Sequence, residues 1–296
     1  MAGTGGSRDW TDGYWWSNDS LRLHFRDYPA ADPATPRPPI ICIPGLTRNA
    51  RDFHEVAAAI GSGWRVLAID LRGRGDSGYA KDPMSYVPLT YVQDVEALIA
   101  SLNLDRFILF GTSLGGIVAM LMASTRPGRV KGALLNDVGP EIDPDGLARI
   151  RTYVGQARGH DTWVHAGRAM AEMHGHVYPG WTLADWIGFA KRTHKLTPAG
   201  KIVPDYDMRI AEPFRLPGGE TGVDLWPALN GLQKVPTLVV RGEASDILSV
   251  DVAARMMGRL DAAEVVTVPG VGHAPTLGEP EARQGIDRLL ERVVGG

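Results

Sequence analysis

Five residues near the middle of the chain, Gly111-Thr-Ser-Leu-Gly115, constrain its fold more than any other feature. They directly follow the apolar run Arg106–Phe110 and directly precede the small and apolar run Gly116–Ala123. This order predicts a buried strand, a sharp turn and a helix. Small residues must flank Ser113 there, because a bulky Cβ would collide with the neighbouring helix and strand. We therefore predict a turn that lifts the Ser113 hydroxyl clear of a sheet, where a base can activate it as a nucleophile.

The rest of the chain alternates in the same way between strand-like and helix-like segments. Short apolar runs are separated by segments whose apolar residues recur every three or four positions. Continuous apolar strands separated by helices are typical of a mostly parallel sheet with helices on both faces, so we predict an α/β fold. Strands are expected at 40–43, 65–69, 107–110, 132–135, 235–240 and 265–268, helices at 52–60, 90–102, 114–124, 253–260 and 281–294, and a β-hairpin at 13–28.

The alternation breaks after residue 140. Residues 141–230 contain helix-like stretches and no convincing strand, and strand-and-helix order resumes at residue 235. We interpret this segment as a helical cap subdomain inserted into one α/β core domain made of residues 1–140 and 231–296. The alternative is that its helices continue the alternation, but the apolar runs that would separate them are missing. The helix-like stretches are 147–154, 162–173 and 183–194.

A serine nucleophile needs a base, and His273 is the best placed of the eight histidines. It lies in a Gly/Pro-rich loop directly after the expected strand 265–268, and α/β sheets place reacting groups at the carboxyl ends of their strands. The acid that orients this base should follow another strand. We expect Asp246, which follows the strand at 235–240, with Asp137 as the alternative because it also follows a strand.

Backbone N–H groups should stabilise the oxyanion that forms when the serine attacks a carbonyl. One donor is the residue after the nucleophile, Leu114, which also opens the expected helix. The second should come from the loop after the strand 40–43, where Leu46 is the candidate. Pro44 cannot donate, and Gly45 permits the sharp bend.

Together these motifs resemble those of the α/β-hydrolase family, over residues 38–294. The chain order Ser113, Asp246, His273 is that family's order. One departure is Pro44, where many relatives carry histidine. The resemblance implies acyl transfer to Ser113 followed by attack of water, with no cofactor. The motifs that carry it are the turn 111–115, the loop 44–47, the stretch 70–77 after a strand, the stretch 241–246, and Gly272-His273.

We therefore expect a carboxylic-ester hydrolase or lactonase that acts on small to medium, apolar or aromatic molecules. The same architecture could serve a C–C bond hydrolase of aromatic degradation, or a perhydrolase or acyltransferase. A protein of another class, a ligand sensor without turnover, is the remaining alternative. Candidate substrate-binding residues are Arg48, which could clamp a carboxylate, and the cap residues Trp163 and Trp186.

Composition narrows the set of partners. The net charge is −3 and the pI about 6.2, which favours neither nucleic acid nor an anionic membrane. The single cysteine, Cys42, lies in an expected strand and is interpreted as a small buried residue. No metal-binding motif, export signal or apolar run of the roughly 18 residues that span a membrane occurs. We expect a cytoplasmic enzyme with a small-molecule substrate and no metal, either monomeric or a homodimer.

Overall fold

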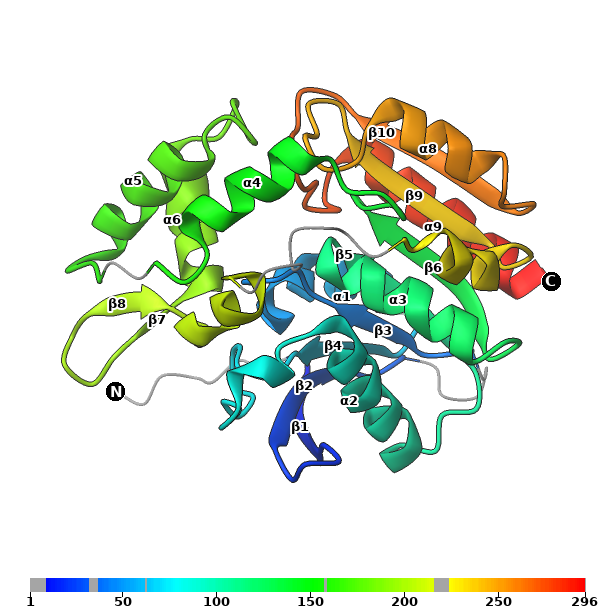
Figure 1. The fold of residues 1–296 in the computed structure, drawn as a ribbon, viewed down its shortest axis with the longest axis horizontal. Coiled ribbons are helices and arrows are strands. Elements are labelled where there is room, and N and C mark those ends of the chain that lie inside the picture. The colour runs from blue at the N-terminus through cyan, green and yellow to red at the C-terminus, as the bar shows by residue number, and fades with distance from the viewer. Residues whose placement is uncertain (1–8, 32–36, 62, 157–158, 216–223, 296) are drawn as a thin grey trace.

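An eight-stranded sheet organises the protein (Figure 1). The computed structural model describes residues 9–31, 37–61, 63–156, 159–215 and 224–295. The strand order is β1-β2-β4-β3-β5-β6-β9-β10, and every pairing from β4 to β10 is parallel. The predicted α/β fold is thus confirmed. The strands are β1 (Thr11–Trp16), β2 (Arg22–Tyr28), β3 (Ile40–Ile43), β4 (Val66–Asp70), β5 (Phe107–Thr112), β6 (Val130–Asn136), β9 (Thr237–Gly242) and β10 (Ala263–Val268).

Helices cover both faces of this sheet. Successive residues of a strand point to opposite faces, so Ile41 and Ile43 of β3 join one apolar cluster while Ile40 and Cys42 join the other. The first cluster includes α2, α3 and α8, and the second includes α1 and α9. Cys42 is fully buried, as expected. The helices are α1 (His54–Ile60), α2 (Pro88–Ser101), α3 (Leu114–Thr125), α8 (Val250–Met257) and α9 (Pro280–Gly295).

The boundaries of the elements differ from the expected ones by a few residues. The helix expected at 253–260 is α8, which begins at Val250 because the Ser249 hydroxyl accepts a hydrogen bond from the N–H of Val252 and caps it. The N-terminal hairpin forms as predicted. Its first strand, β1, is the edge of the sheet, and its second, β2, pairs antiparallel with β4.

Residues 141–230 form the inserted segment, and the part of it that the structure describes lies outside the sheet. Strand β6 pairs directly with β9, so within its described residues the inserted segment adds no strand between them. Figure 1 shows its helices α4 to α6 grouped at one end of the molecule. The expectation of no strand is wrong, because two three-residue strands form a small antiparallel sheet of their own. The elements are α4 (Pro144–Tyr153), α5 (Trp163–His174), α6 (Leu183–Thr193), β7 (His194–Leu196), β8 (Ile202–Pro204) and α7 (Trp226–Leu229).

Short 3-10 helices complete the fold. They are η1 (Ala50–Phe53), η2 (Pro83–Ser85), η3 (Met208–Arg215) and η4 (Asn230–Leu232). Within the described ranges, no helix combines the length and the apolar character that crossing a membrane requires.

Candidate active site

The turn between β5 and α3 has the sharp geometry that the sequence predicts. Ser113 adopts a φ of 51°, a left-handed backbone conformation that is uncommon for a residue with a side chain. The neighbouring glycines make this possible. A Cβ at Gly115 would lie 2.0 Å from the carbonyl oxygen of Ile43, and one at Gly111 would lie 2.3 Å from the carbonyl oxygen of Gly115. Only glycine fits at these two positions without moving the backbone.

Three side chains form a hydrogen-bonded line at this turn. The Ser113 hydroxyl lies 2.9 Å from Nε2 of His273, and Nδ1 of His273 lies 2.7 Å from Oδ2 of Asp137. Asp137 has no solvent-exposed surface, and its carboxylate also accepts hydrogen bonds from Gly242 N–H (2.8 Å) and the Ser245 hydroxyl (2.6 Å). A carboxylate held by these donors fixes His273 in the tautomer with Nδ1–H, which leaves Nε2 free to accept the serine proton.

The expected contact between Asp246 and His273 is not the one the structure shows. The carboxylate of Asp246 instead pairs with the guanidinium of Arg149 on α4, at 2.5 and 2.8 Å. Burial alone would raise the pKa of Asp246, but the hydrogen bond and positive charge of Arg149 hold it below its usual range. The position next to the histidine belongs to Asp137, the alternative that the sequence left open.

Strand register explains why Asp137 takes this position. Asn136, the last residue of β6, pairs with Thr112 of β5, so the residues that follow each of them, Asp137 and Ser113, are neighbours across two adjacent strands. The Ser113 N–H donates to the Asn136 carbonyl at 2.9 Å, which holds the two strand ends together. Asp246 follows β9, one strand further away, and comes four residues after the end of that strand.

The candidate oxyanion donors lie beside the serine. A Cβ on Gly45 would lie 3.7 Å from Cβ of Ser113, so the loop after β3 approaches the nucleophile closely. The side chain of Arg74 donates a hydrogen bond of 2.8 Å to the Leu46 carbonyl and fixes that loop. Neither the Leu46 N–H nor the Leu114 N–H has a hydrogen-bond acceptor in the part of the chain that the structure describes.

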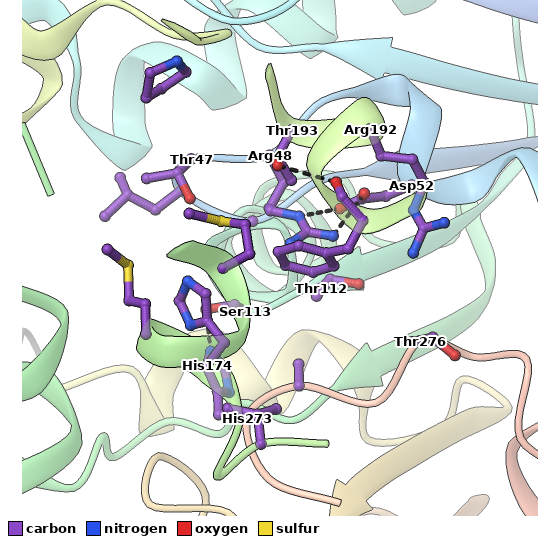
Figure 2. A pocket seen from close by; sticks show the side chains of 18 of the residues that line it. Thr47, Arg48, Asp52, Thr112, Ser113, His174, Arg192, Thr193, His273 and Thr276 are labelled. Atoms are coloured by element: carbon purple, nitrogen blue, oxygen red, sulfur yellow. Dashed lines mark hydrogen bonds and ion pairs between the residues drawn. The ribbon is translucent and has the colours of Figure 1, made fainter. Parts of the chain in front are cut away.

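A cavity of about 810 Å³ opens over Ser113 and His273 (Figure 2). Its walls come from both the sheet and the inserted segment. Arg48, a predicted substrate-binding residue, lines it, but Asp52 pairs with the Arg48 guanidinium at 2.5 and 2.7 Å, and that guanidinium also lies over the Phe189 ring. Residues that line the cavity include Leu46, Arg48, Ser113, Arg149, Tyr153, His174, Tyr178, Phe189, Arg192 and His273.

The two predicted tryptophans do not line this cavity. Trp186 is 4% exposed and packs between α5 and α6, in the apolar cluster of the inserted segment, and Trp163 packs against the same cluster. The smaller Tyr178 and Phe189 reach the cavity instead. Trp186 and Phe189 are three positions apart on α6 and so share one face, where the rings meet edge to face. Helical spacing could have indicated Phe189, but not which of the two faces the cavity.

The cavity is richer in arginine than in carboxylate groups. Asp246 and Asp205 neutralise Arg149 and Arg51. Arg192 has a looser partner, since its Nη1 lies 3.9 Å from a carboxylate oxygen of Glu55, which is largely exposed. An anionic group of a ligand would therefore meet favourable charge near Arg192.

Among the residues that the structure describes, one group of side chains could hold a metal ion by its geometry. Ligand atoms of His24, Asp70 and Asp76 lie within 4.8 Å of one another. The imidazole of His24 bonds to Asp70 (2.7 Å) and to Asp12 (3.0 Å), and Asp70 also accepts the Ala50 N–H. The His24 and Asp70 atoms serve hydrogen bonds that link β1, β2 and β4, and we assign no metal to this group.

The fold, the turn at Ser113 and the hydrogen-bonded histidine define a class of protein. A sequence model of the alpha/beta hydrolase family matches residues 40–283. The chain belongs to this family, as the motifs predict, and is a hydrolase.

Comparison with individual proteins shows which members of the family the chain is similar to. The chain is 36% identical over 268 residues to a 3-hydroxybutyrate-oligomer hydrolase of Cupriavidus necator, covering 88% of this chain and 89% of that protein. It is 27% identical to a 2-(acetamidomethylene)succinate hydrolase of Mesorhizobium japonicum, over 80% of this chain and 82% of that one. A solved alpha/beta hydrolase from Novosphingobium aromaticivorans shares 54% identity and a TM-score of 0.92, over 97% of this chain and 100% of that one.

Proposed function

We propose that the chain hydrolyses esters formed between short hydroxy acids, through an acyl-enzyme on Ser113. The observation that carries this proposal is the line of hydrogen bonds from Asp137 through His273 to the Ser113 hydroxyl. The ester class follows from the similarity to a 3-hydroxybutyrate-oligomer hydrolase, which extends over most of both chains.

Each step of the reaction has a group to perform it. Nε2 of His273 takes the Ser113 proton while Oγ attacks the ester carbonyl carbon, and the buried Asp137 carboxylate stabilises the imidazolium that forms. The N–H groups of Leu46 and Leu114 receive the negative oxygen of the tetrahedral intermediate. The imidazolium then returns its proton to the alcohol oxygen as the ester C–O bond breaks. A water then gives a proton to His273 and attacks the acyl carbon. The imidazolium returns that proton to Ser113 Oγ as the acyl C–Oγ bond breaks, which releases the acid.

The cavity suits such a substrate in charge as well as in size. An ester of two hydroxy acids carries a carboxylate on its alcohol part, and we assign that carboxylate to the side of the cavity near Arg192. Arg48 lies on the same wall, where Asp52 offsets its charge. We also propose that the inserted segment, residues 141–230, is the cap of the site, because Arg149, Tyr153 and Phe189 of this segment line the cavity.

The test is a substrate panel with a nucleophile variant. The wild type should release 3-hydroxybutyrate from its linear dimer. Ser113→Ala should lower kcat by about 10⁴- to 10⁶-fold, because both proton transfer and acyl transfer need the hydroxyl. Its melting temperature should stay close to that of the wild type, since the change removes one oxygen that borders the cavity. Activity retained in purified Ser113→Ala would overturn the proposal.

The same panel separates the alternatives. Preferred opening of lactones over linear esters would indicate a lactonase. Cleavage of a vinylogous diketone without cleavage of esters would indicate a C–C bond hydrolase. Transfer of the acyl group to peroxide or to an added alcohol, in place of water, would indicate a perhydrolase or acyltransferase. A single turnover without steady-state release would indicate a ligand sensor.

A further inference from the structure

His174 stands at the C-terminal end of α5, and its side chain enters the cavity that Ser113 and His273 line (Figure 2). Aromatic side chains hold its ring in place. The Tyr153 ring meets it at a right angle with centroids 5.4 Å apart, and the Phe189 ring lies at 5.9 Å. The orientation of the imidazole is therefore fixed by packing, without a polar contact.

Neither ring nitrogen of His174 has a hydrogen-bond partner among the described residues. Two other polar side chains at the cavity wall are engaged. Arg149 bonds to Asp246, and the Tyr178 hydroxyl donates to the Ala274 carbonyl at 2.5 Å. The ring is held by packing at the wall of the cavity, and its two nitrogens meet no partner in the described part of the chain. They are therefore positioned to bind a ligand.

The charge state of His174 selects the kind of ligand. Burial and the positive charges of Arg48 and Arg149 lower the pKa of His174 to about 3. The ring is therefore neutral near pH 7, with one nitrogen donating and the other accepting. A neutral hydroxyl, which also donates and accepts, complements it. A carboxylate would bind more favourably to the arginine side chains that line the cavity.

We propose that His174 determines specificity by hydrogen-bonding a hydroxyl on the acyl chain of the substrate. This inference rests on the proposed function. In an ester of two hydroxy acids, the alcohol part carries the carboxylate and the acyl part ends in a neutral hydroxyl. The neutral ring of His174 then receives the uncharged end of the molecule, and Arg192 receives the charged end.

Two esters that differ only in this hydroxyl test the proposal. We compare kcat/KM for p-nitrophenyl 3-hydroxybutyrate and p-nitrophenyl butyrate, which share a leaving group. In the wild type the hydroxylated ester should be preferred. In His174→Phe, which keeps an aromatic ring and loses both polar nitrogens, the ratio of the two kcat/KM values should fall about ten-fold, the size of one hydrogen bond. His174→Gln, whose amide still donates and accepts, should recover part of the ratio.

His165→Phe is the matched control, since His165 lies on the same helix, is exposed and does not line the cavity. It should leave the ratio unchanged. If His174→Phe lowers kcat/KM equally for both esters, or changes neither, His174 has a packing role only and the inference is wrong. A wild type that hydrolyses neither ester would instead contradict the proposed function, so the two failures are distinguishable.

Discussion

The sheet and the inserted segment hold their site residues by different means. Ser113 and Asp137 follow the ends of adjacent strands, and backbone hydrogen bonds and buried donors fix both. His174 and Phe189 lie on separate helices of the inserted segment and are held by contacts between rings. The positions of Ser113 and Asp137 therefore depend on strand register, while the positions of the cavity-lining side chains of the inserted segment depend on side-chain packing. Substitutions in the two regions should fail in different ways.

After loss of the nucleophile itself, the largest effect is expected at Asp137. In Asp137→Asn the side chain can no longer stabilise the imidazolium, and its amide can donate where Nδ1–H must donate. His273 is then held in the wrong tautomer, so kcat should fall about 10⁴-fold. Steady-state hydrolysis of p-nitrophenyl butyrate measures this loss, with circular dichroism to check folding.

Asp246→Asn is the matched control for Asp137. It removes a charge from a partly exposed ion pair with Arg149, so kcat should change less than about ten-fold. If Asp246→Asn were the crippling change and Asp137→Asn the mild one, the assignment of the acid would be reversed. Comparable losses in both would mean that the two carboxylates act together.

The choice between these two aspartates marks how far the sequence could lead. The sequence predicts the strands, the helices that cover the sheet, the turn at Ser113 and the loop of His273. Each of these is encoded by a local pattern of apolar residues, glycines and prolines. The order of strands across a sheet is not local. That β6 lies beside β5, and that Asp137 therefore neighbours Ser113, appears only in the folded chain.

The inserted segment was harder to predict for a related reason. The sequence predicts its helices, but it also favours Trp186 as a cavity residue, and Trp186 lies instead in the packed interface between α5 and α6. A large aromatic ring is equally suited to a cavity wall and to a packed helix interface, and the helical repeat does not distinguish the two positions. The hairpin of β7 and β8 was missed because three-residue strands are too short to show an alternating pattern.

A smaller effect, on stability, should separate the same two regions. In Gly115→Ala the new Cβ would lie 2.0 Å from a backbone oxygen of β3, which cannot move cheaply, so we expect a loss of about 1–3 kcal/mol or more. Gly180 of the inserted segment has no atom within 4 Å of a built Cβ, and Gly180→Ala should stay within about 0.5 kcal/mol. Chemical denaturation of both variants measures the difference. Equal losses would contradict the close packing of the turn.

The smallest expected effect is that the stabilities of the two regions change in opposite directions with pH. In the inserted segment burial lowers the pKa of His174 to about 3, helped by Arg48 and Arg149, and that of His194 to about 4, helped by His160. The unfolded chain therefore takes up protons first, and these two residues should stabilise the segment less as the pH falls below about 6.5.

His24, between β1, β2 and β4, behaves in the opposite sense. Burial alone would lower its pKa, but the hydrogen bonds and charge of Asp70 and Asp12 outweigh burial and raise it. Its contribution is fully present below about pH 6.5 and is lost as the pH rises through the raised value. Acid should thus favour this hairpin while it weakens the inserted segment.

Hydrogen exchange at pH 7.5 and pH 5, corrected for intrinsic exchange rates, can resolve this divergence. We expect protection to fall at pH 5 in α5 and α6, by about 1–2 kcal/mol per buried histidine, and to be kept in β1 and β2. His174→Gln should reduce the acid sensitivity of α5, whereas His165→Gln, at an exposed position of the same helix, should not. Equal loss of protection in both regions would show that the buried histidines do not set the response. If α5 lost as much protection at pH 5 in His174→Gln as in the wild type, the acid-sensitive group would lie elsewhere in the inserted segment.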